Sequence, residues 1–304
     1  MNRKTLIDEI KRLKTERKAV IVAHSYQNED IQAIADVTGD SYALSKYCAD
    51  MKEAEVIVFC GVHFMAESAK ILSPLKTVLL PEIKAGCPMA DMVDRQGLIA
   101  KKKEHPNATV LCYINSTAEV KAECDVCCTS SNAVDIVKKI ETEEILFVPD
   151  KNLSRYVAAQ VPEKKIVLWE GFCPVHNSIN PEIVREMKDK HPEAKLLIHP
   201  ECTPEICEFA DYIGSTKQII DYAKESPYKE FIIGTEMGVM SILERENPDK
   251  MFHLLDSCLV CKDMKITTLE SVYNALKNNT HEIVLDREVM DKARGSLERM
   301  LELG

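Results

Sequence analysis

The chain has 304 residues, 45% hydrophobic and 29% charged, which predicts a folded protein of two or three compact units rather than a disordered one. Its formal net charge of −10 argues against a nucleic-acid partner, because phosphate binding depends on clustered Lys and Arg side chains. No apolar run approaches the roughly 20 residues of a membrane span, and the charged start lacks the apolar core of a signal peptide, so we expect a cytoplasmic protein without membrane contact.

Short apolar runs alternate with amphipathic helical stretches along the whole chain, beginning with a charged helix over residues 1–18. Nine of the runs are predicted strands: residues 19–24, 56–60, 77–81, 109–114, 144–149, 165–170, 195–200, 231–235 and 251–256. Mixed charges predict a last, solvent-facing helix over residues 287–304. Strands that alternate with helices in this way are typical of βα units with a parallel sheet.

Corresponding landmarks recur along the chain, which indicates three copies of one unit. A polar residue ends a strand in each copy, at His24, Tyr113 and His199, which are 89 and 86 residues apart. Hydroxyl-rich turns and cysteines recur at similar intervals: residues 39–41, 129–131 and 214–216, and Cys87, Cys173 and Cys261. The alternative is that any α/β protein has elements at such a spacing.

Two copies also share literal sequence. A Cys-Pro pair begins at Cys87 and again at Cys173, and a His-Pro pair follows each of them 18 residues later, at His105 and His191. Ligands of parallel α/β sheets bind at the carboxyl ends of the strands, where helices begin. Three such units around a pseudo-threefold axis would direct their strand ends, and one cysteine each, into a central cavity.

Twelve cysteines are present, and in a reducing cytoplasm such a count favours metal or cluster ligation over disulfides. Three converging thiolates can anchor three irons of a 4Fe-4S cluster and leave the fourth open to substrate as a Lewis acid. The alternative is zinc or a redox pair, since Cys258 and Cys261 form a C-x-x-C motif, as do Cys124 and Cys127. Cys128 and the latter pair are expected to be packed as small hydrophobes.

Ordered motifs extend from residue 24 to residue 265. They are HSYQ (24–27), GDS (39–41), CGVHFMAE (60–67), GCPMAD (86–91), YIN (113–115), TSSNA (129–133), GFCPVH (171–176), HPEC (199–202), GST (214–216), GTE (234–236) and CLVC (258–261). In these motifs the chain resembles the quinolinate synthase family over nearly its full length. That family joins iminoaspartate to dihydroxyacetone phosphate, so the resemblance implies these two substrates and an aspartate-oxidising enzyme as a functional partner.

The resemblance implies an α/β fold of three pseudo-symmetric αβα domains, Rossmann-like with parallel sheets, around a central active site. We assign residues 1–86, 87–172 and 173–286 to the three units and expect the helix over 287–304 to pack back on the first. It also implies a 4Fe-4S cluster bound by Cys87, Cys173 and Cys261. Cys261 is preferred to Cys258 because it stands three residues before Met264, and Cys258 would be free to pair with it in an inactive state.

The resemblance, together with the chemistry of each side chain, gives the remaining site. Glu201 is the expected base, supported by His199, while His24, Tyr26 and Tyr113 are expected to steer protons. Substrate binding is expected from these and from further polar side chains: His24, Ser41, Tyr113, Asn115, Ser130, His176, His199, Glu201, Ser215 and Thr216. The alternatives are an iron-sulfur hydro-lyase acting on a single hydroxy acid, and a non-catalytic iron-sulfur or zinc sensor.

Overall fold

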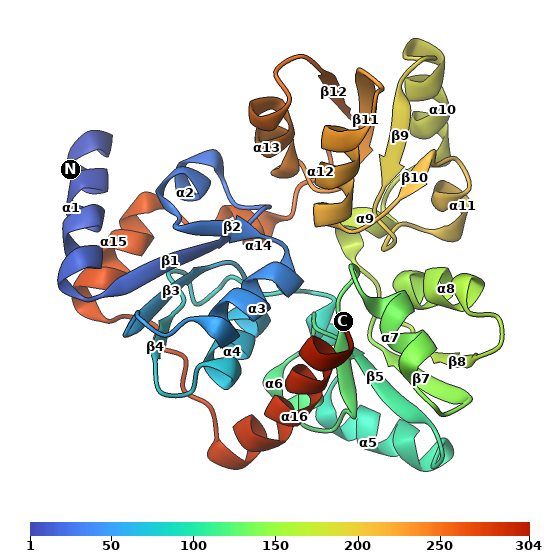
Figure 1. Cartoon of the computed structure of the whole chain (residues 1–304), viewed down its shortest axis with the longest axis horizontal. Helices are drawn as coiled ribbons and strands as arrows, with labels where there is room; N and C mark the ends of the chain where they lie inside the picture. Colours follow the sequence, from blue (N-terminus) through green and yellow to red (C-terminus); the bar gives the residue numbers. More distant parts are fainter.

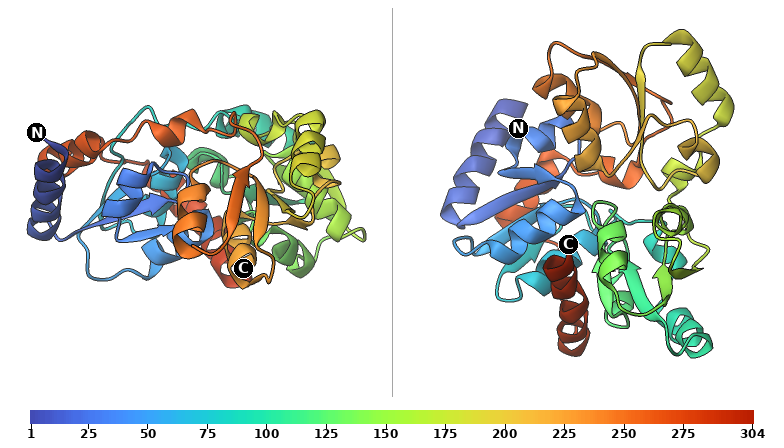
Figure 2. Two further views of the ribbon diagram at one scale, coloured as in Figure 1. Left: turned by 90° about the horizontal axis from the view of Figure 1, so that it is seen from above. Right: turned by 45° about the vertical axis from the view of Figure 1, so that its right-hand side comes forward.

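Twelve strands form three separate parallel sheets in the computed structural model, which describes residues 1–304 (Figure 1). The strand order is the same in each sheet: β2-β1-β3-β4, β6-β5-β7-β8 and β10-β9-β11-β12. Helices flank every sheet, and the three units surround a common centre (Figure 1), forming a molecule that is thin when seen from above (Figure 2). The predicted α/β class with three pseudo-symmetric units is confirmed.

The first sheet is assembled from strands within residues 19–79. Its elements are α1 (Arg3–Glu16), β1 (Ala19–His24), α2 (Glu29–Ile34), β2 (Val37–Gly39), α3 (Ser41–Asp50), β3 (Val56–Cys60), α4 (His63–Leu72) and β4 (Thr77–Leu79). All five residues of β3 are buried, because a parallel sheet is covered by helices on both faces and its central strands are apolar throughout.

The second sheet lies within residues 109–168. Its unit contains η1 (Ala90–Met92), α5 (Arg95–Glu104), β5 (Thr109–Tyr113), α6 (Ala118–Lys121), β6 (Val126–Cys128), α7 (Ala133–Lys139), β7 (Glu144–Val148), α8 (Lys151–Gln160) and β8 (Lys165–Leu168). The third unit contains α9 (Pro174–Asn177), α10 (Pro181–Lys190), β9 (Lys195–Ile198), α11 (Pro204–Cys207), β10 (Tyr212–Ile213), α12 (Thr216–Glu225), β11 (Glu230–Gly234), α13 (Val239–Glu246), β12 (Met251–Leu254) and α14 (Lys262–Lys265).

All nine predicted strands are present, but one of the two edge strands of each sheet was not predicted. These edge strands, β2, β6 and β10, have only two or three residues each, too few to show a period. An aspartate precedes each of them, and its carboxylate accepts a backbone N–H of the neighbouring strand: Asp36 from Ile21 at 2.8 Å, Asp125 from Val110 at 2.7 Å and Asp211 from Leu196 at 2.9 Å. The three aspartates, 89 and 86 residues apart, fix where the edge strands begin.

The end of the chain does not follow the predicted borders. Helix α15 (Leu269–Asn278), which we had placed in the third unit, packs on α1 and β3 of the first, and its Val272 shares a core with Leu6 and Ile10. Helix α16 (Arg287–Leu303) contacts α4 of the first unit but also β6, α6 and α7 of the second. It therefore lies between two units (Figure 1) instead of packing on the first alone. No helix in the structure combines the length and apolarity required to cross a membrane.

Candidate functional site

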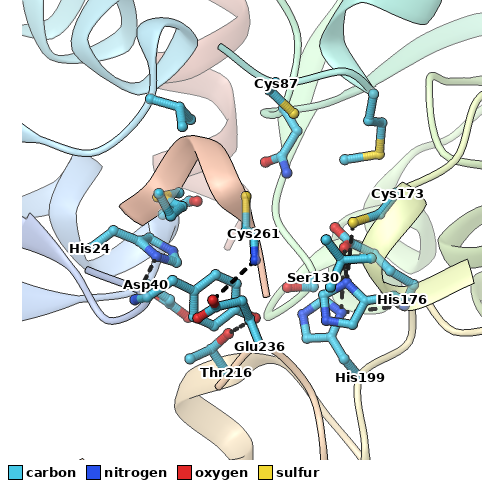
Figure 3. A pocket seen from close by; sticks show the side chains of 18 of the residues that line it. His24, Asp40, Cys87, Ser130, Cys173, His176, His199, Thr216, Glu236 and Cys261 are labelled. Carbon is cyan, nitrogen blue, oxygen red and sulfur yellow. Dashed lines mark hydrogen bonds and ion pairs between the residues drawn. The ribbon is translucent and has the colours of Figure 1, made fainter. Parts of the chain in front are cut away.

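A cavity with about 700 Å³ of empty space lies where the carboxyl ends of the three sheets meet. Side chains from all three units line it (Figure 3). Every predicted site residue except Ser215 is among them: His24, Tyr26, Ser41, Cys87, Tyr113, Asn115, Ser130, Cys173, His176, His199, Glu201, Thr216 and Cys261. The threefold repeat in the sequence thus corresponds to three strand ends that meet in space.

Two polar residues at the end of the first strand of each unit line the cavity: His24 and Tyr26, Tyr113 and Asn115, and His199 and Glu201. His24 and Tyr113 end β1 and β5, and His199 directly follows β9. The chain then turns in the same way in the first and third units: the backbone N–H of Tyr26 donates to His24 Nδ1 at 3.1 Å, and that of Glu201 to His199 Nδ1 at 3.3 Å. Tyr26 and Glu201 therefore occupy equivalent positions of the repeat, but one carries a phenol and the other a carboxyl group.

The three predicted ligand cysteines are free, half-buried thiols, and each follows the last strand of a different sheet: Cys87 follows β4, Cys173 follows β8 and Cys261 follows β12. Figure 3 shows their sulfur atoms directed into the same space. Burial raises the pKa of Cys87 to about 12 and that of Cys261 to about 11, so these thiols ionise at neutral pH only when a cation binds them. Converging thiolates are the soft donors that bind iron-sulfur clusters or zinc. Cys258, by contrast, is exposed and lies outside the cavity.

Buried carboxylates fix the loops that carry these cysteines. The N–H of Cys173 donates to Asp150 Oδ2 at 3.1 Å, and the N–H of Cys261 donates to Glu236 Oε1 at 3.1 Å. Asp150 and Glu236 are fully buried and lie two residues beyond β7 and β11. Lys265 pairs with Glu236 at 3.0 Å. Sequence reasoning assigned no such role to these residues, although the two acids are 86 residues apart and follow the repeat.

The ligand loop of the first unit is tied differently. Val62, not an acid, occupies the position two residues beyond β3. The loop is held instead by the third unit, because the N–H of Gly86 donates to Asp263 Oδ1 at 3.1 Å. The loops of Cys87 and Cys261 are thereby joined directly across the interface between units.

Glu201 is the centre of a buried hydrogen-bond network. Its Oε1 accepts the Tyr113 hydroxyl at 2.6 Å, and its Oε2 lies 2.7 Å from Nδ1 of His176. The His176 ring stacks on that of His199, with centroids 4.6 Å apart, and its Nδ1 is 3.3 Å from Cys173 Sγ. A ligand cysteine, two imidazoles, a carboxylate and a phenol are therefore in contact, which is an arrangement suited to moving protons beside a metal centre.

A second chain of hydrogen bonds joins Tyr26 to the same imidazole. The Tyr26 hydroxyl lies 2.7 Å from Thr216 Oγ1 and 2.8 Å from Thr235 Oγ1, and Thr235 Oγ1 lies 2.9 Å from His176 Nε2. Thr235 is fully buried. Thr235 belongs to the GTE motif (234–236), but a lone threonine after a strand carries no chemical signal, so the sequence did not predict its role.

The protonation states in this network follow from burial and pairing. Burial raises the pKa of Tyr26 and of Tyr113, so both phenols keep their protons at neutral pH. Burial also raises the pKa of Glu201, but the neighbouring His199 and His176 outweigh it and lower that pKa to about 2. Burial lowers the pKa of His199 to about 3. Glu201 is therefore ionised at neutral pH and lies beside a neutral His199 and a protonated Tyr113.

Hydroxyl groups line the cavity at the starts of helices. Ser41 and Thr216 are the first residues of α3 and α12, and Ser130 lies in the turn before α7. Helix N-termini carry free N–H groups and favour anions. Ser215 is fully buried and caps α12 by accepting the N–H of Gln218 at 3.3 Å. The structure therefore gives Ser215 a capping contact and does not bring it to the cavity.

Asn115 on the cavity wall has an unsatisfied acceptor. Its side-chain Oδ1 is buried and has no hydrogen-bond partner. Buried polar atoms without partners are rare in folded proteins, and they mark places where a ligand or water completes the bonding. This atom fits the predicted substrate-binding role of Asn115.

Buried His24 makes the folded protein less stable in acid. Burial lowers the pKa of His24 to about 3, from an ordinary value of 6.5. The unfolded chain therefore takes up a proton near pH 6.5 that the folded chain excludes, and the free energy of unfolding falls as the pH drops. We expect His24→Asn, whose side-chain oxygen still accepts the Tyr26 N–H, to reduce this slope by about 1.4 kcal/mol per pH unit between about pH 6.5 and 4.5. Urea unfolding of the cluster-free protein measures it, and equal slopes would contradict a neutral buried imidazole.

Comparison with known proteins identifies the family of the chain. The family model for quinolinate synthetase A protein (NadA) matches residues 8–302. A quinolinate synthase of Caldicellulosiruptor saccharolyticus is 57% identical over 295 residues, 97% of each chain. Those of Clostridioides difficile and Methanosarcina barkeri are 53% and 52% identical, over 99% of this chain and 98% of theirs. The chain belongs to the quinolinate synthase family, the enzymes that form quinolinate in NAD biosynthesis.

Proposed function

We propose that this protein condenses iminoaspartate with dihydroxyacetone phosphate to form quinolinate, releasing phosphate and two molecules of water. The reaction balances without an oxidant or a reductant, so the protein has to supply binding, proton transfer and activation of the leaving oxygens. The single observation that carries the proposal is the convergence of Cys87, Cys173 and Cys261, which follow the last strands of three different sheets, on a cavity lined by proton-transfer groups. Membership of the quinolinate synthase family supports it.

The donor set fits a 4Fe-4S cluster. Cys87, Cys173 and Cys261 would bind three of its irons, and no fourth cysteine lines the cavity. When bound, the cluster supplies an open iron that acts as a Lewis acid toward a substrate hydroxyl or carboxylate. The backbone bonds to Asp150 and Glu236 hold two of the ligand loops in place.

Substrate anions would be held by the hydroxyl-lined helix starts. Both substrates are acidic, and the protein carries a net negative charge. Hydrogen-bond donors in the cavity therefore have to outweigh the repulsion between this charge and the substrates. Ser41, Ser130 and Thr216 supply hydroxyl donors at the cavity wall, and the Asn115 amide orients a carboxylate or a hydroxyl.

Proton transfer would centre on Glu201. Carbon–carbon bond formation, the ketose-to-aldose rearrangement and each loss of water require a base for a C–H proton and an acid for oxygen. Ionised Glu201 accepts protons, and Tyr113, hydrogen-bonded to it at 2.6 Å, donates them. Tyr26 is joined through Thr235 to His176, and His24 and His199 complete the wall as neutral imidazoles.

The metabolic setting follows from the substrates. Iminoaspartate hydrolyses in water, so an aspartate-oxidising enzyme has to supply it where this protein acts. We place the protein in the cytoplasm, where its cysteines stay reduced, without a nucleic-acid or membrane partner.

The test is the reaction itself. The protein is purified anaerobically, its iron and sulfide are counted, and it is supplied with iminoaspartate and dihydroxyacetone phosphate. We expect about four irons per chain and quinolinate that appears only when both substrates are present. Turnover of a single hydroxy acid without the amine would instead indicate a hydro-lyase, and cluster binding without any turnover would indicate a sensor. Either result overturns the proposal.

A further inference from the structure

A second group of metal-binding side chains lies in the third unit, outside the central cavity. His191 directly follows α10, Glu230 is the first residue of β11, and His253 lies on β12. One ring nitrogen from each histidine and one carboxylate oxygen all lie within 4.8 Å of one another. Because Glu230 begins the strand whose other end reaches the cavity, the group is about 13 Å from that end.

The two imidazoles converge on one oxygen atom. Nδ1 of His191 lies 2.9 Å from Oε1 of Glu230, and Nε2 of His253 lies 2.8 Å from the same atom. The rings are stacked with centroids 3.7 Å apart. The side chains are 16%, 23% and 26% exposed for His191, Glu230 and His253, so the group is held by packing but remains accessible to an ion.

The second unit provides a comparison within the same chain. His105 and Glu144 occupy the positions of His191 and Glu230, with His105 Nδ1 3.1 Å from Glu144 Oε1. There the third partner is Lys165, whose Nζ lies 2.7 Å from the same oxygen. An ammonium group has no lone pair for a metal. The His–Glu pair is therefore a shared structural contact, and only the third unit adds another potential ligand.

Strand register explains this difference. In the third sheet Glu230 is aligned with Met251, which places His253 two residues further along β12 on the same face as Glu230. In the second sheet Glu144 is aligned with Lys165, and the residue two further along is Val167. His253, at the position of Val167, thus adds a second ring nitrogen to the His191–Glu230 pair, so that two nitrogens and one oxygen lie close together.

We propose that His191, Glu230 and His253 bind a divalent metal ion of the zinc class, with one position left to water. Two histidines and one glutamate form a recognised ligand set for zinc. In a tetrahedral site with bonds of about 2.0 Å the ligand atoms are about 3.3 Å apart. The two nitrogen–oxygen distances of 2.9 and 2.8 Å therefore have to lengthen slightly, and the stacked rings have to tilt so that both nitrogens face the ion. The ion would join the end of α10 to β11 and β12 and stabilise the third unit, without a part in the central reaction.

The test uses the anaerobic holoenzyme, in which the cluster occupies the central thiolates, with Cys258→Ser in every variant to remove the exposed thiol. Zinc binding is measured by competition with a chromophoric chelator. We expect one equivalent to bind, with affinity reduced by about 100-fold or more in His253→Gln and in Glu230→Gln. The matched control His105→Gln, at the equivalent pair of the second unit, keeps the affinity of the parent protein.

Two further readouts separate this site from the cysteines. Zinc raises the melting temperature of the parent protein, because it binds the folded chain, and this rise is absent in His253→Gln. Cobalt in place of zinc gives visible bands of a nitrogen and oxygen site without thiolate charge-transfer absorption. Equal zinc affinity in the parent and His253→Gln, or cobalt spectra dominated by thiolate bands, would overturn the proposal.

Discussion

Replacing Cys87, Cys173 or Cys261 by alanine is expected to abolish quinolinate formation and to reduce the bound iron. Each substitution removes one of three anchoring thiolates, and the cavity contains no fourth cysteine that could take its place. We expect turnover below about 1% of wild type in each variant, because losing a direct ligand costs at least as much as losing the outer partners that support it. Iron and sulfide counts, the cluster absorbance and quinolinate formation measure the effect.

Two cysteines serve as controls. Cys258 is exposed, and Cys128 is fully buried in the second unit. Cys258→Ala and Cys128→Ala are expected to keep the cluster and the activity, although the latter removes buried atoms and lowers the stability slightly. A cluster that persists in all three ligand variants, or that is lost equally in Cys258→Ala, would contradict the ligand set.

Glu201→Gln lowers kcat by about 100- to 10,000-fold while the cluster stays bound, because the amide keeps the shape of the side chain but accepts no proton. Its oxygen still accepts the Tyr113 hydroxyl, while the amide nitrogen replaces the oxygen that faces His176 Nδ1. Quinolinate formation across a range of pH measures it, together with iron content. Glu205→Gln, an exposed acid on α11, is the matched control and should retain wild-type activity. Turnover close to wild type in Glu201→Gln would exclude Glu201 as the base.

Much of the fold could be predicted because the same pattern of strands, polar strand ends and turns occurs three times in the sequence. A polar residue at a strand end, such as His24, carries little information alone. Because polar residues recur at the equivalent positions Tyr113 and His199, the sequence identified the strand ends that face the cavity. Edge strands β2, β6 and β10 were not predicted because each is positioned by a hydrogen bond that a backbone N–H donates to Asp36, Asp125 or Asp211, and not by an apolar run. A single aspartate is ordinary in a loop, and only its triplication carries a signal.

The path of the chain after the third sheet could not be predicted. Helix α15 has an apolar face that would suit any of the three units, and its contact with α1 depends on where the chain emerges. Helix α16 likewise buries Ala293, Leu297 and Met300 in a core shared by the first two units. An amphipathic sequence indicates that one face of a helix is buried, but it does not indicate which other element of the protein covers that face.

The site was predicted where its residues carry reactive groups and missed where they support others. Cysteine, histidine and glutamate at repeated strand ends suggested chemistry directly. Thr235, Asp150 and Lys265 act through contacts with residues far away in sequence, and such contacts exist only once the strands and their loops have folded together. Cys127 and Cys128 are fully buried, as expected for packed thiols.

The central claim is that three cysteines, each following the last strand of a different sheet, hold one cluster whose fourth iron is open to the substrates. Mössbauer spectroscopy of the active protein, loaded with iron-57 and measured with and without quinolinate, tests it most directly. We expect about one quarter of the iron to change its isomer shift and quadrupole splitting when quinolinate binds, while the rest keeps the signature of cysteine-bound iron. A spectrum that quinolinate leaves unchanged, in protein that makes quinolinate, would contradict an open iron at the active site.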